Sequence, residues 1–323
     1  MKMNSDLLGE KKKSEFNDAP WRFPIISLIS ELKEKMLTDK PKYINVGGKL
    51  LDLTTPRVMG IINVTPDSFY KGSRVTEDKD IIFTAGKMIQ DGADILDVGG
   101  YSSRPNAADI PPEEEKKRVL NAIKLIRKEF PDSIISIDTF RSEIANEAVT
   151  GCGANIINDI SAGEADGKMF NVVCSLNVPY IMMHMQGTPG TMQNNPVYND
   201  VVADILRWFS SRIVRLQSAG VKDIIIDPGF GFGKTAEHNF DLLRRLGEFS
   251  VAGLPLLAGV SRKSMIWKTL GITPDEALNG TTILNTLALY GGADIIRVHD
   301  VREAVQTVRL VEKLKSTGSE IKS

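Results

Sequence analysis

Eight short apolar runs follow one another along the chain, and each ends in polar or glycine-containing residues. The runs are rich in Ile, Val and Leu, as buried parallel strands are. Stretches with helical character separate them, the clearest at 112–130, where acidic residues come first and basic residues last. This alternation predicts a (β/α)8 TIM barrel. The expected strands are 58–63, 95–99, 134–138, 155–158, 180–183, 224–227, 256–260 and 294–298.

The polar residues at the ends of these runs are the candidates for chemistry. All strands of such a barrel point the same way, so their carboxyl ends meet at one rim. Side chains scattered over more than 200 positions are therefore expected to lie close together. The runs lead into Asn63, Gly99, Asp138, Asn158, His184, Asp227, Ser261 and Arg297.

The first part of the chain has a different pattern. Residues 1–20 are polar and predict a mobile tail, and residues 21–38 could form one amphipathic helix. Residues 43–53 read as two strands around Gly47 and Gly48, a hairpin that could close the bottom of the barrel. We therefore expect an N-terminal extension over 1–42 and a barrel domain with its own N-terminal β-hairpin over 43–323.

Composition narrows the class of protein. The 323 residues are 42% apolar, enough for a full core, and the formal charge of −1 lacks the basic excess of a nucleic-acid binder. No apolar run is long enough for a secretory signal or a membrane span. Two cysteines make neither a disulfide framework nor a metal cage. We expect a cytoplasmic protein without nucleic-acid or membrane partners.

Two loops carry hydroxyls, amides and cations. The first, 60–74, combines Asn63, Thr65 and Asp67 and could hold a phosphate or hydrated Mg²⁺, although a plain turn also fits. The second, 99–106, offers Arg104 and serine hydroxyls on a glycine-started loop. That loop suits a carboxylate or phosphate partner, and a solvated loop is the alternative.

Three strand ends suggest the shape of a ligand. Asp138, Asn158 and Asp227 each close an apolar run, and a carboxylate there costs free energy unless it is paired. Two acids and an amide facing one site suit a flat heterocycle with several N–H donors. The alternative is that one of the acids only caps the local backbone.

The last strands supply cations. Ser261–Ser264 brings hydroxyls, Arg262 and Lys263 to a strand-to-helix junction, where anions are favoured. Arg297 and His299 follow the eighth strand, a common phosphate position in barrels. The segment after Asp227 superficially suggests a phosphate-binding loop, but Pro228 replaces its first glycine, so we expect a flexible aromatic loop instead.

Taken together, these motifs strongly resemble those of the dihydropteroate synthase family over about residues 43–315. The matching segments are 63–69, 97–105, 137–139, 158–159, 183–189, 227–234, 261–264 and 297–299. The resemblance implies condensation of 6-hydroxymethyl-7,8-dihydropterin pyrophosphate with p-aminobenzoate, giving 7,8-dihydropteroate in folate biosynthesis. It also implies a homodimer, Mg²⁺ as cofactor and competition by sulfonamides.

The resemblance also implies roles for individual residues. Those for pterin are Asp138, Asn158, Met183, Asp227, Lys263 and Arg297. Those for p-aminobenzoate are Ser103, Arg104, Pro105, Phe232, Lys263 and Ser264. Pyrophosphate would contact Asn63, Arg297 and His299, with Mg²⁺ near Asn63. Loops that close over the site would carry Thr65, Asp67, Phe69 and Arg104. The catalytic set would be Asp138, Asp227, Lys263, Arg297 and His299.

The sequence leaves two alternative functions open, and three of its residues differ from the usual pattern of the family. A corrinoid-linked methyltetrahydrofolate methyltransferase would share the Asp and Asn contacts but would not need the 261–264 segment. A non-catalytic pterin-binding protein is a second alternative. Tyr101, Ser103 and Asn106 depart from the usual Glu, Thr and Gly of the second loop. Those departures leave the response to sulfonamides open.

Overall fold

The computed structural model describes residues 40–64, 74–102 and 110–317. Eight parallel strands form one sheet, in the order β8-β7-β6-β5-β4-β3-β10-β9. A bridge between Ile226 and Leu256 joins its two edges, so the sheet closes into the predicted barrel. The strands are β3 Arg57–Asn63, β4 Ile95–Gly99, β5 Ile134–Asp138, β6 Ile156–Asp159, β7 Tyr180–Met183, β8 Ile224–Asp227, β9 Leu257–Ala258 and β10 Ile295–Val298.

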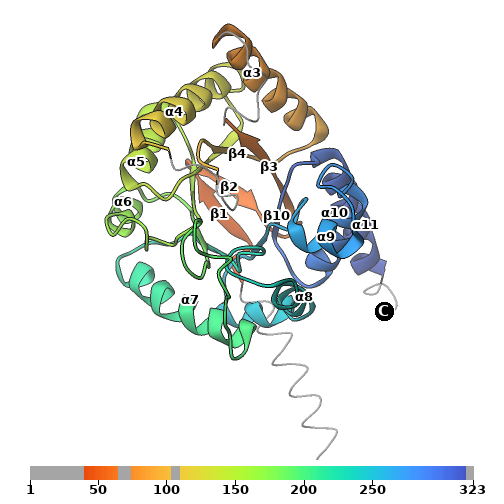
Figure 1. The fold of residues 1–323 in the computed structure, drawn as a ribbon. Helices are drawn as coiled ribbons and strands as arrows, with labels where there is room; N and C mark the ends of the chain where they lie inside the picture. Colours follow the sequence, from red (N-terminus) through yellow and green to blue (C-terminus); the bar gives the residue numbers. More distant parts are fainter. Residues whose placement is uncertain (1–39, 65–73, 103–109, 318–323) are drawn as a thin grey trace, which may run out of the picture. The chain divides into compact units, whose positions relative to one another are not determined.

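Helices surround the barrel (Figure 1). They are α3 Arg74–Asp91, α4 Pro112–Glu129, α5 Ser142–Cys152, α6 Met169–Leu176, α7 Val201–Ser218, α8 Ala236–Arg244, α9 Ser264–Leu270, α10 Leu278–Tyr290 and α11 Val301–Thr317, with the 3-10 turn η1 Leu246–Ala252. The predicted helix at 112–130 is α4. Pro112 begins it, three glutamates occupy its first turn, and Arg127 and Lys128 lie in its last turn.

The predicted hairpin is also present. Strand β1 Tyr43–Val46 pairs antiparallel with β2 Lys49–Asp52, and Gly47 and Gly48 supply the positive φ angles of the turn. Ile44, Val46 and Leu53 pack on the apolar layer inside the barrel. That layer lies at the amino ends of the strands, so the hairpin closes the bottom of the barrel, as expected (Figure 1).

The interior of the barrel changes from apolar to polar along the strands. Each strand contributes one residue to the apolar layer: Met59, Ile95, Ile134, Ile156, Ile181, Ile225, Leu257 and Ile295. Side chains two positions further along a strand face the same side. Those next positions are Ile61, Asp97, Ser136, Asn158, Met183, Asp227, Gly259 and Arg297. The polar residues therefore gather at the carboxyl ends of the strands.

A larger apolar core lies between the strands and the surrounding helices. It buries the outward-facing strand residues, such as Ile137 and Ile226, and the inner faces of the helices. Among the described helices, none combines the length and apolar character needed to cross a bilayer. The predicted helix at 21–38 and the domain boundary at 42 involve residues outside the described ranges and stay predictions.

Candidate active site

Arg297 lies between two carboxylates at the carboxyl end of the barrel. Its Nε donates to Oδ2 of Asp97 at 2.6 Å, and its Nη2 donates to Oδ2 of Asp138 at 2.5 Å. Asn158 donates from Nδ2 to the same oxygen of Asp97 at 3.1 Å. Four strands, β4, β5, β6 and β10, thus meet in one hydrogen-bonded group. The sequence predicted three of these residues as a site and did not single out Asp97.

The pKa values in this group are determined by burial and by the presence of two carboxylates beside one guanidinium. Burial is the main cause that raises the pKa of Asp138 to about 7; the charge of Arg297 opposes it, and the charge of Asp97 adds to it. Burial disfavours the charged form of Arg297, but the two carboxylates outweigh burial and raise its pKa. Asp138 can therefore change its protonation state near neutral pH, while Arg297 remains a cation.

A second group joins strands β8 and β9. Asp227 is buried and accepts from the main-chain N–H of Gly229 at 2.8 Å. Burial raises its pKa, and the charge of Lys263 opposes that shift. Lys263 donates from Nζ to the carbonyl of Phe230, and its ammonium lies 4.7 Å from the ring centroid of Phe232.

Lys263 is the cation shared by the two groups. Burial lowers the pKa of Lys263 to about 8, although the charges of Asp227 and Asp138 act in the opposite direction. The charges of Asp138 and Asp227 therefore both act on the ammonium of Lys263. Two acids, an amide, an ammonium and a guanidinium converge at one end of the barrel.

The glycine-rich segment after Asp227 is folded around a buried lysine. Lys234 is only 3% exposed, and its Nζ donates to the carbonyl oxygens of Gly229 and Phe232, both at 2.9 Å. It also lies 3.1 Å from Nδ1 of His184. Burial is the main cause that holds the pKa of Lys234 well below its usual value. The sequence suggested a flexible aromatic loop here and missed this lysine, which ties the segment together.

His184 faces away from the barrel interior. Met183, one residue earlier, is the interior side chain of β7, so the next residue points outward. The His184 ring packs edge-on against Trp208 of α7, with 4.8 Å between ring centroids, and burial lowers its pKa to about 2. Among the eight candidate strand ends, His184 therefore supports the glycine-rich segment, and Met183 faces the site.

The two cations of the 261–264 segment have different partners. Arg262 forms a two-pronged ion pair with Asp300, at 2.9 Å from Nε and 2.8 Å from Nη2. Its backbone has a φ of 52°, an uncommon value for a non-glycine residue. The Lys263 ammonium instead contacts the carbonyl of Phe230 and the ring face of Phe232. Arg262 thus anchors the segment to the end of β10 and leaves Lys263 to the site.

The remaining described candidates lie at the same end of the barrel. Asn63 ends β3 and pairs with Gly99 of β4. The main-chain N–H of His299 donates to Oγ of Ser261 at 3.2 Å, which joins the ends of β9 and β10. Ser264 begins α9 next to Lys263. The other candidates lie outside the described residues, namely Thr65, Asp67, Phe69, Ser103, Arg104 and Pro105.

Asp97 and Lys234 are the residues that the sequence interpretation missed. Asp97 lies inside the apolar run of β4, and the sequence analysis assigned it no role. The signal was its spacing: it follows the apolar residue Ile95 by two positions, as Asn158 follows Ile156. Lys234 had no comparable signal, because only the folded segment brings three carbonyl groups around its ammonium.

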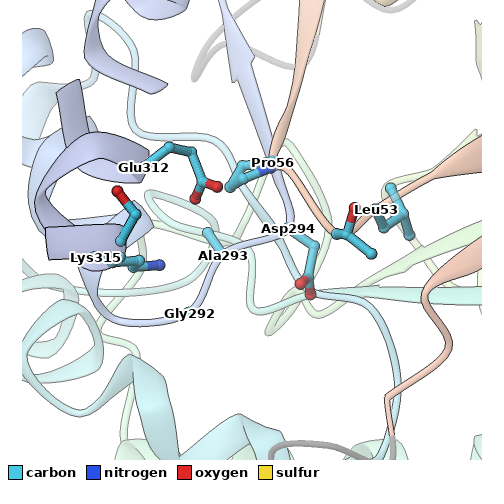
Figure 2. A pocket seen from close by; sticks show the side chains of 9 residues that line it. Leu53, Pro56, Gly292, Ala293, Asp294, Glu312 and Lys315 are labelled. Carbon is cyan, nitrogen blue, oxygen red and sulfur yellow. The ribbon is translucent and has the colours of Figure 1, made fainter. Parts of the chain in front are cut away.

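A pocket of about 380 Å³ lies at the other end of the barrel (Figure 2). Asp294, just before β10, and Lys315, in α11, line it. The carboxylate of Asp294 accepts from the main-chain N–H of Leu256 at 2.7 Å, and Lys315 donates to the carbonyl of Leu289 at 2.9 Å. Both charged groups are hydrogen-bonded to the main chain. They lie at the opposite end of the barrel from the converging acids.

Comparison with known proteins identifies the family. The model of the pterin binding enzyme family matches residues 59–299. The dihydropteroate synthase of Escherichia coli K12 is 46% identical over 267 residues, which cover 82% of this chain and 94% of that protein. The chain belongs to the dihydropteroate synthase family. The family model covers β4 to β10 in full and β3 from its third residue onward.

Solved structures of dihydropteroate synthases share the fold. The enzyme from Yersinia pestis, solved with a sulfonamide drug complex, has a TM-score of 0.80 and 39% identity, covering 85% of this chain and 99% of that chain. The enzyme from Xanthomonas albilineans, solved with 4-aminobenzoic acid, has a TM-score of 0.79 and 37% identity, covering 85% and 98%. The barrel predicted from the sequence is thus the barrel of the dihydropteroate synthase family.

Proposed function

We propose that the converging group at the carboxyl end of the barrel carries out the dihydropteroate synthase reaction. The enzyme condenses 6-hydroxymethyl-7,8-dihydropterin pyrophosphate with p-aminobenzoate and releases pyrophosphate. The observation that carries the assignment of the site is that Asp138, Asn158, Asp227, Lys263 and Arg297, from five different strand ends, gather around the barrel opening. This arrangement suits one flat, hydrogen-bonding ligand.

In the proposed site the pterin lies among these groups. The two carboxylates and the amide oxygen of Asn158 accept hydrogen bonds in the plane of the ring, and Lys263 donates to the ring carbonyl. Met183, which is 3% exposed on the inner face of β7, provides an apolar surface. Arg297 covers the ring and directs its charge toward the leaving group.

The pyrophosphate is proposed to lie over the ends of β3 and β10. Arg297 and His299 reach it from one strand, and Asn63 reaches it from the neighbouring strand, since β10 pairs with β3. In the described ranges, no cluster of three acidic, histidine or cysteine side chains could hold a metal ion. Mg²⁺ typically keeps several waters and takes its other ligands from substrate phosphates, so one amide oxygen of Asn63 fits it. A bound Mg²⁺ would neutralise charge on the departing pyrophosphate.

The p-aminobenzoate is proposed to bind beside Phe232, Lys263 and Ser264. The ammonium of Lys263 lies over the face of the Phe232 ring, so a cation and an aromatic surface are adjacent here. Ser103, Arg104 and Pro105 would complete this part of the site. Sulfonamides carry a similar arylamine, and we expect them to compete with p-aminobenzoate.

The reaction replaces one bond at the exocyclic methylene. The C–O bond to pyrophosphate breaks, and the ring spreads the positive charge that develops on the CH₂ group. Asp138 and Asp227 stabilise that charge. The aniline nitrogen, neutral at pH 7, then forms the C–N bond and gives up its proton to the released pyrophosphate, so no protein nucleophile is needed. The main task of the protein is to position the nitrogen and exclude water.

We also propose that the enzyme is a homodimer. Helix α10 exposes Ile283, Leu287 and Tyr290, which are spaced by four and three residues and so lie on one face. The adjoining helix α11 exposes Leu310 and Leu314. An apolar outer face on two neighbouring helices is typical of a covered surface, and a second copy would cover it.

Both cysteines are free, which fits the proposed cytoplasmic location.

A coupled assay of pyrophosphate release tests the activity. Purified protein, dihydropterin pyrophosphate and Mg²⁺ are mixed with and without p-aminobenzoate. We expect release that depends on the arylamine and a sulfonamide that raises KM for p-aminobenzoate without lowering kcat. No release, together with methyl transfer from methyltetrahydrofolate, would assign the barrel to the methyltransferase alternative. Pterin binding without any turnover would leave a binding protein.

A further inference from the structure

Asp97 is the most deeply buried acid of the site, with 0% of its surface exposed. Its Oδ2 accepts from both Asn158 and Arg297, at 3.1 and 2.6 Å. Its other oxygen, Oδ1, has no hydrogen-bond partner among the described residues. A buried acceptor without a donor costs free energy, so the position is not explained by stability alone.

We infer that Asp97 is a positioning residue that sets the donor and acceptor pattern of the pterin site by orienting Asn158 and Arg297. The inference rests on the proposed pterin site. Asp97 itself is fully enclosed, so it acts through its two partners.

The orientation of Asn158 follows from the chemistry of a carboxylate. An ionised carboxylate only accepts hydrogen bonds, so it must meet the Nδ2 end of the Asn158 amide. The Oδ1 end then faces the ligand as an acceptor, in the same sense as the carboxylates of Asp138 and Asp227. A site lined by three acceptors selects a ligand edge that carries N–H donors.

The contact with Arg297 has a second consequence. Asp97 binds Nε, at the root of the guanidinium, whereas Asp138 binds the terminal Nη2. When the ligand donates to Asp138, the Nη2 contact is exchanged for contacts with the ligand, and the Nε contact remains. Asp97 thereby keeps the guanidinium over the site while Asp138 changes partner.

Replacement of Asp97 by Asn separates this role from a purely structural one. An amide side chain has almost the same shape, but it can also donate to Oδ1 of Asn158 and so permits the reversed amide. The probes are pterin and its 2,4-dioxo analogue, in which a carbonyl acceptor replaces the 2-amino donor. Calorimetry measures Kd for both ligands in the wild-type protein and in Asp97→Asn. Ser136→Ala is the matched control. Ser136 pairs with Asp97 on the neighbouring strand and is fully buried, and its hydroxyl has no hydrogen-bond partner in the described part of the chain.

We expect the wild type and Ser136→Ala to prefer pterin strongly. In Asp97→Asn we expect pterin binding to weaken by roughly tenfold to a hundredfold, and the preference for pterin over the dioxo analogue to fall by about tenfold, as loss of a charged hydrogen bond implies. An unchanged preference would overturn the inference, whether or not affinity falls. A wild-type protein that binds neither ligand would instead refute the proposed pterin site.

A structure of the wild-type protein with pterin provides a test that does not depend on the variant folding. We expect Asn158 Nδ2 and Arg297 Nε to remain on Asp97, and Arg297 Nη2 to have left Asp138. Departure of Asn158 or of Arg297 Nε from Asp97 in the bound state would contradict the inference.

Discussion

Arg297 and Asp138 are ion-paired at 2.5 Å although they are 159 positions apart in the chain. The pair joins the ends of β10 and β5 across the barrel opening. It places a cation that suits pyrophosphate next to an acid that suits the pterin ring. This ion pair therefore connects the proposed pyrophosphate-binding part of the site with the proposed pterin-binding part.

Replacement of Asp138 by Asn should remove most activity while the fold is kept. The amide keeps the shape but loses the charge that would stabilise the developing cation, so we expect kcat/KM to fall by about a hundredfold or more. Pyrophosphate release measures the loss, and thermal unfolding checks the fold. Asp132→Asn is the control, since the Asp132 side chain is 91% exposed. Full turnover in Asp138→Asn would refute the assignment of the pterin site.

Pterin binding should weaken both at acidic pH and at alkaline pH. Asp138 must be ionised to accept a ring N–H, and its pKa is about 7, so Kd should rise up to about tenfold per pH unit below that value. Lys263 must carry its proton, and its pKa of about 8 predicts weaker binding at higher pH. Calorimetry from pH 5.5 to 9.5, values chosen to span about 1.5 units on either side of these limits, tests both. Asp138→Asn should abolish the acid limb only, and an acid limb that persists in this variant would assign it to another group.

The same pKa shift has a consequence for stability. An acid whose pKa is higher in the folded state than its unfolded value of 3.8 binds its proton more tightly when folded. Its contribution to the free energy of unfolding of the ligand-free enzyme therefore falls as pH rises from about 4 to about 7 and stays low above that. Urea unfolding of the wild type and of Asp138→Asn at pH 5 and pH 8, about one to two units to either side of the shifted pKa, isolates this contribution.

Replacement of Lys234 by Met should loosen the glycine-rich segment. The change leaves the carbonyl oxygens of Gly229 and Phe232 without a donor, and we expect a loss of about 2–4 kcal/mol in the free energy of unfolding. Because Phe232 shifts with the segment, KM for p-aminobenzoate should rise more than kcat falls. Lys222→Met, at an exposed position, is the control. Unchanged stability and KM would mean that the segment holds its shape without the lysine.

Gly229 should not tolerate a side chain. It has a φ of 72°, and a Cβ there would lie 2.0 Å from the carbonyl oxygen of His184. Gly220 has a similar φ of 89° but open space around it. We expect Gly220→Ala to cost about 1 kcal/mol from backbone strain alone and Gly229→Ala to cost several times more, with loss of activity. Equal costs in denaturant unfolding would contradict the close contact.

The proposed homodimer can be tested on α10. Leu287 is 50% exposed on the apolar face shared with α11. We expect Leu287→Glu to convert the dimer to a monomer in sedimentation experiments. Phe83→Glu, which changes a Phe that is 73% exposed on α3, should leave the dimer intact. A wild-type protein that sediments as a monomer would refute the proposal.

The sequence predicted the barrel well because parallel strands leave a local signal. Four of the eight expected strands, at 95–99, 134–138, 180–183 and 224–227, have the observed bounds. The expected strand 256–260 was longer than β9, which spans only Leu257–Ala258. There the chain leaves the ladder early and turns toward Arg262, whose partner Asp300 is 38 positions away. No local pattern reveals such a partner.

The candidate residues are predictable from the sequence because they lie where apolar runs end. The apolar residues of a buried strand and the polar residues that follow it are neighbours in the chain. The sequence therefore decided which residues reach the rim of the barrel. The partners of those residues were decided by the tertiary structure. Closure of the barrel places Asp97 beside Asn158 and Arg297, and folding of the glycine-rich segment places Lys234 among three carbonyl groups. Hydrogen bonds and charge interactions depend on distance in space, and strand pairing sets that distance between residues that are far apart along the chain.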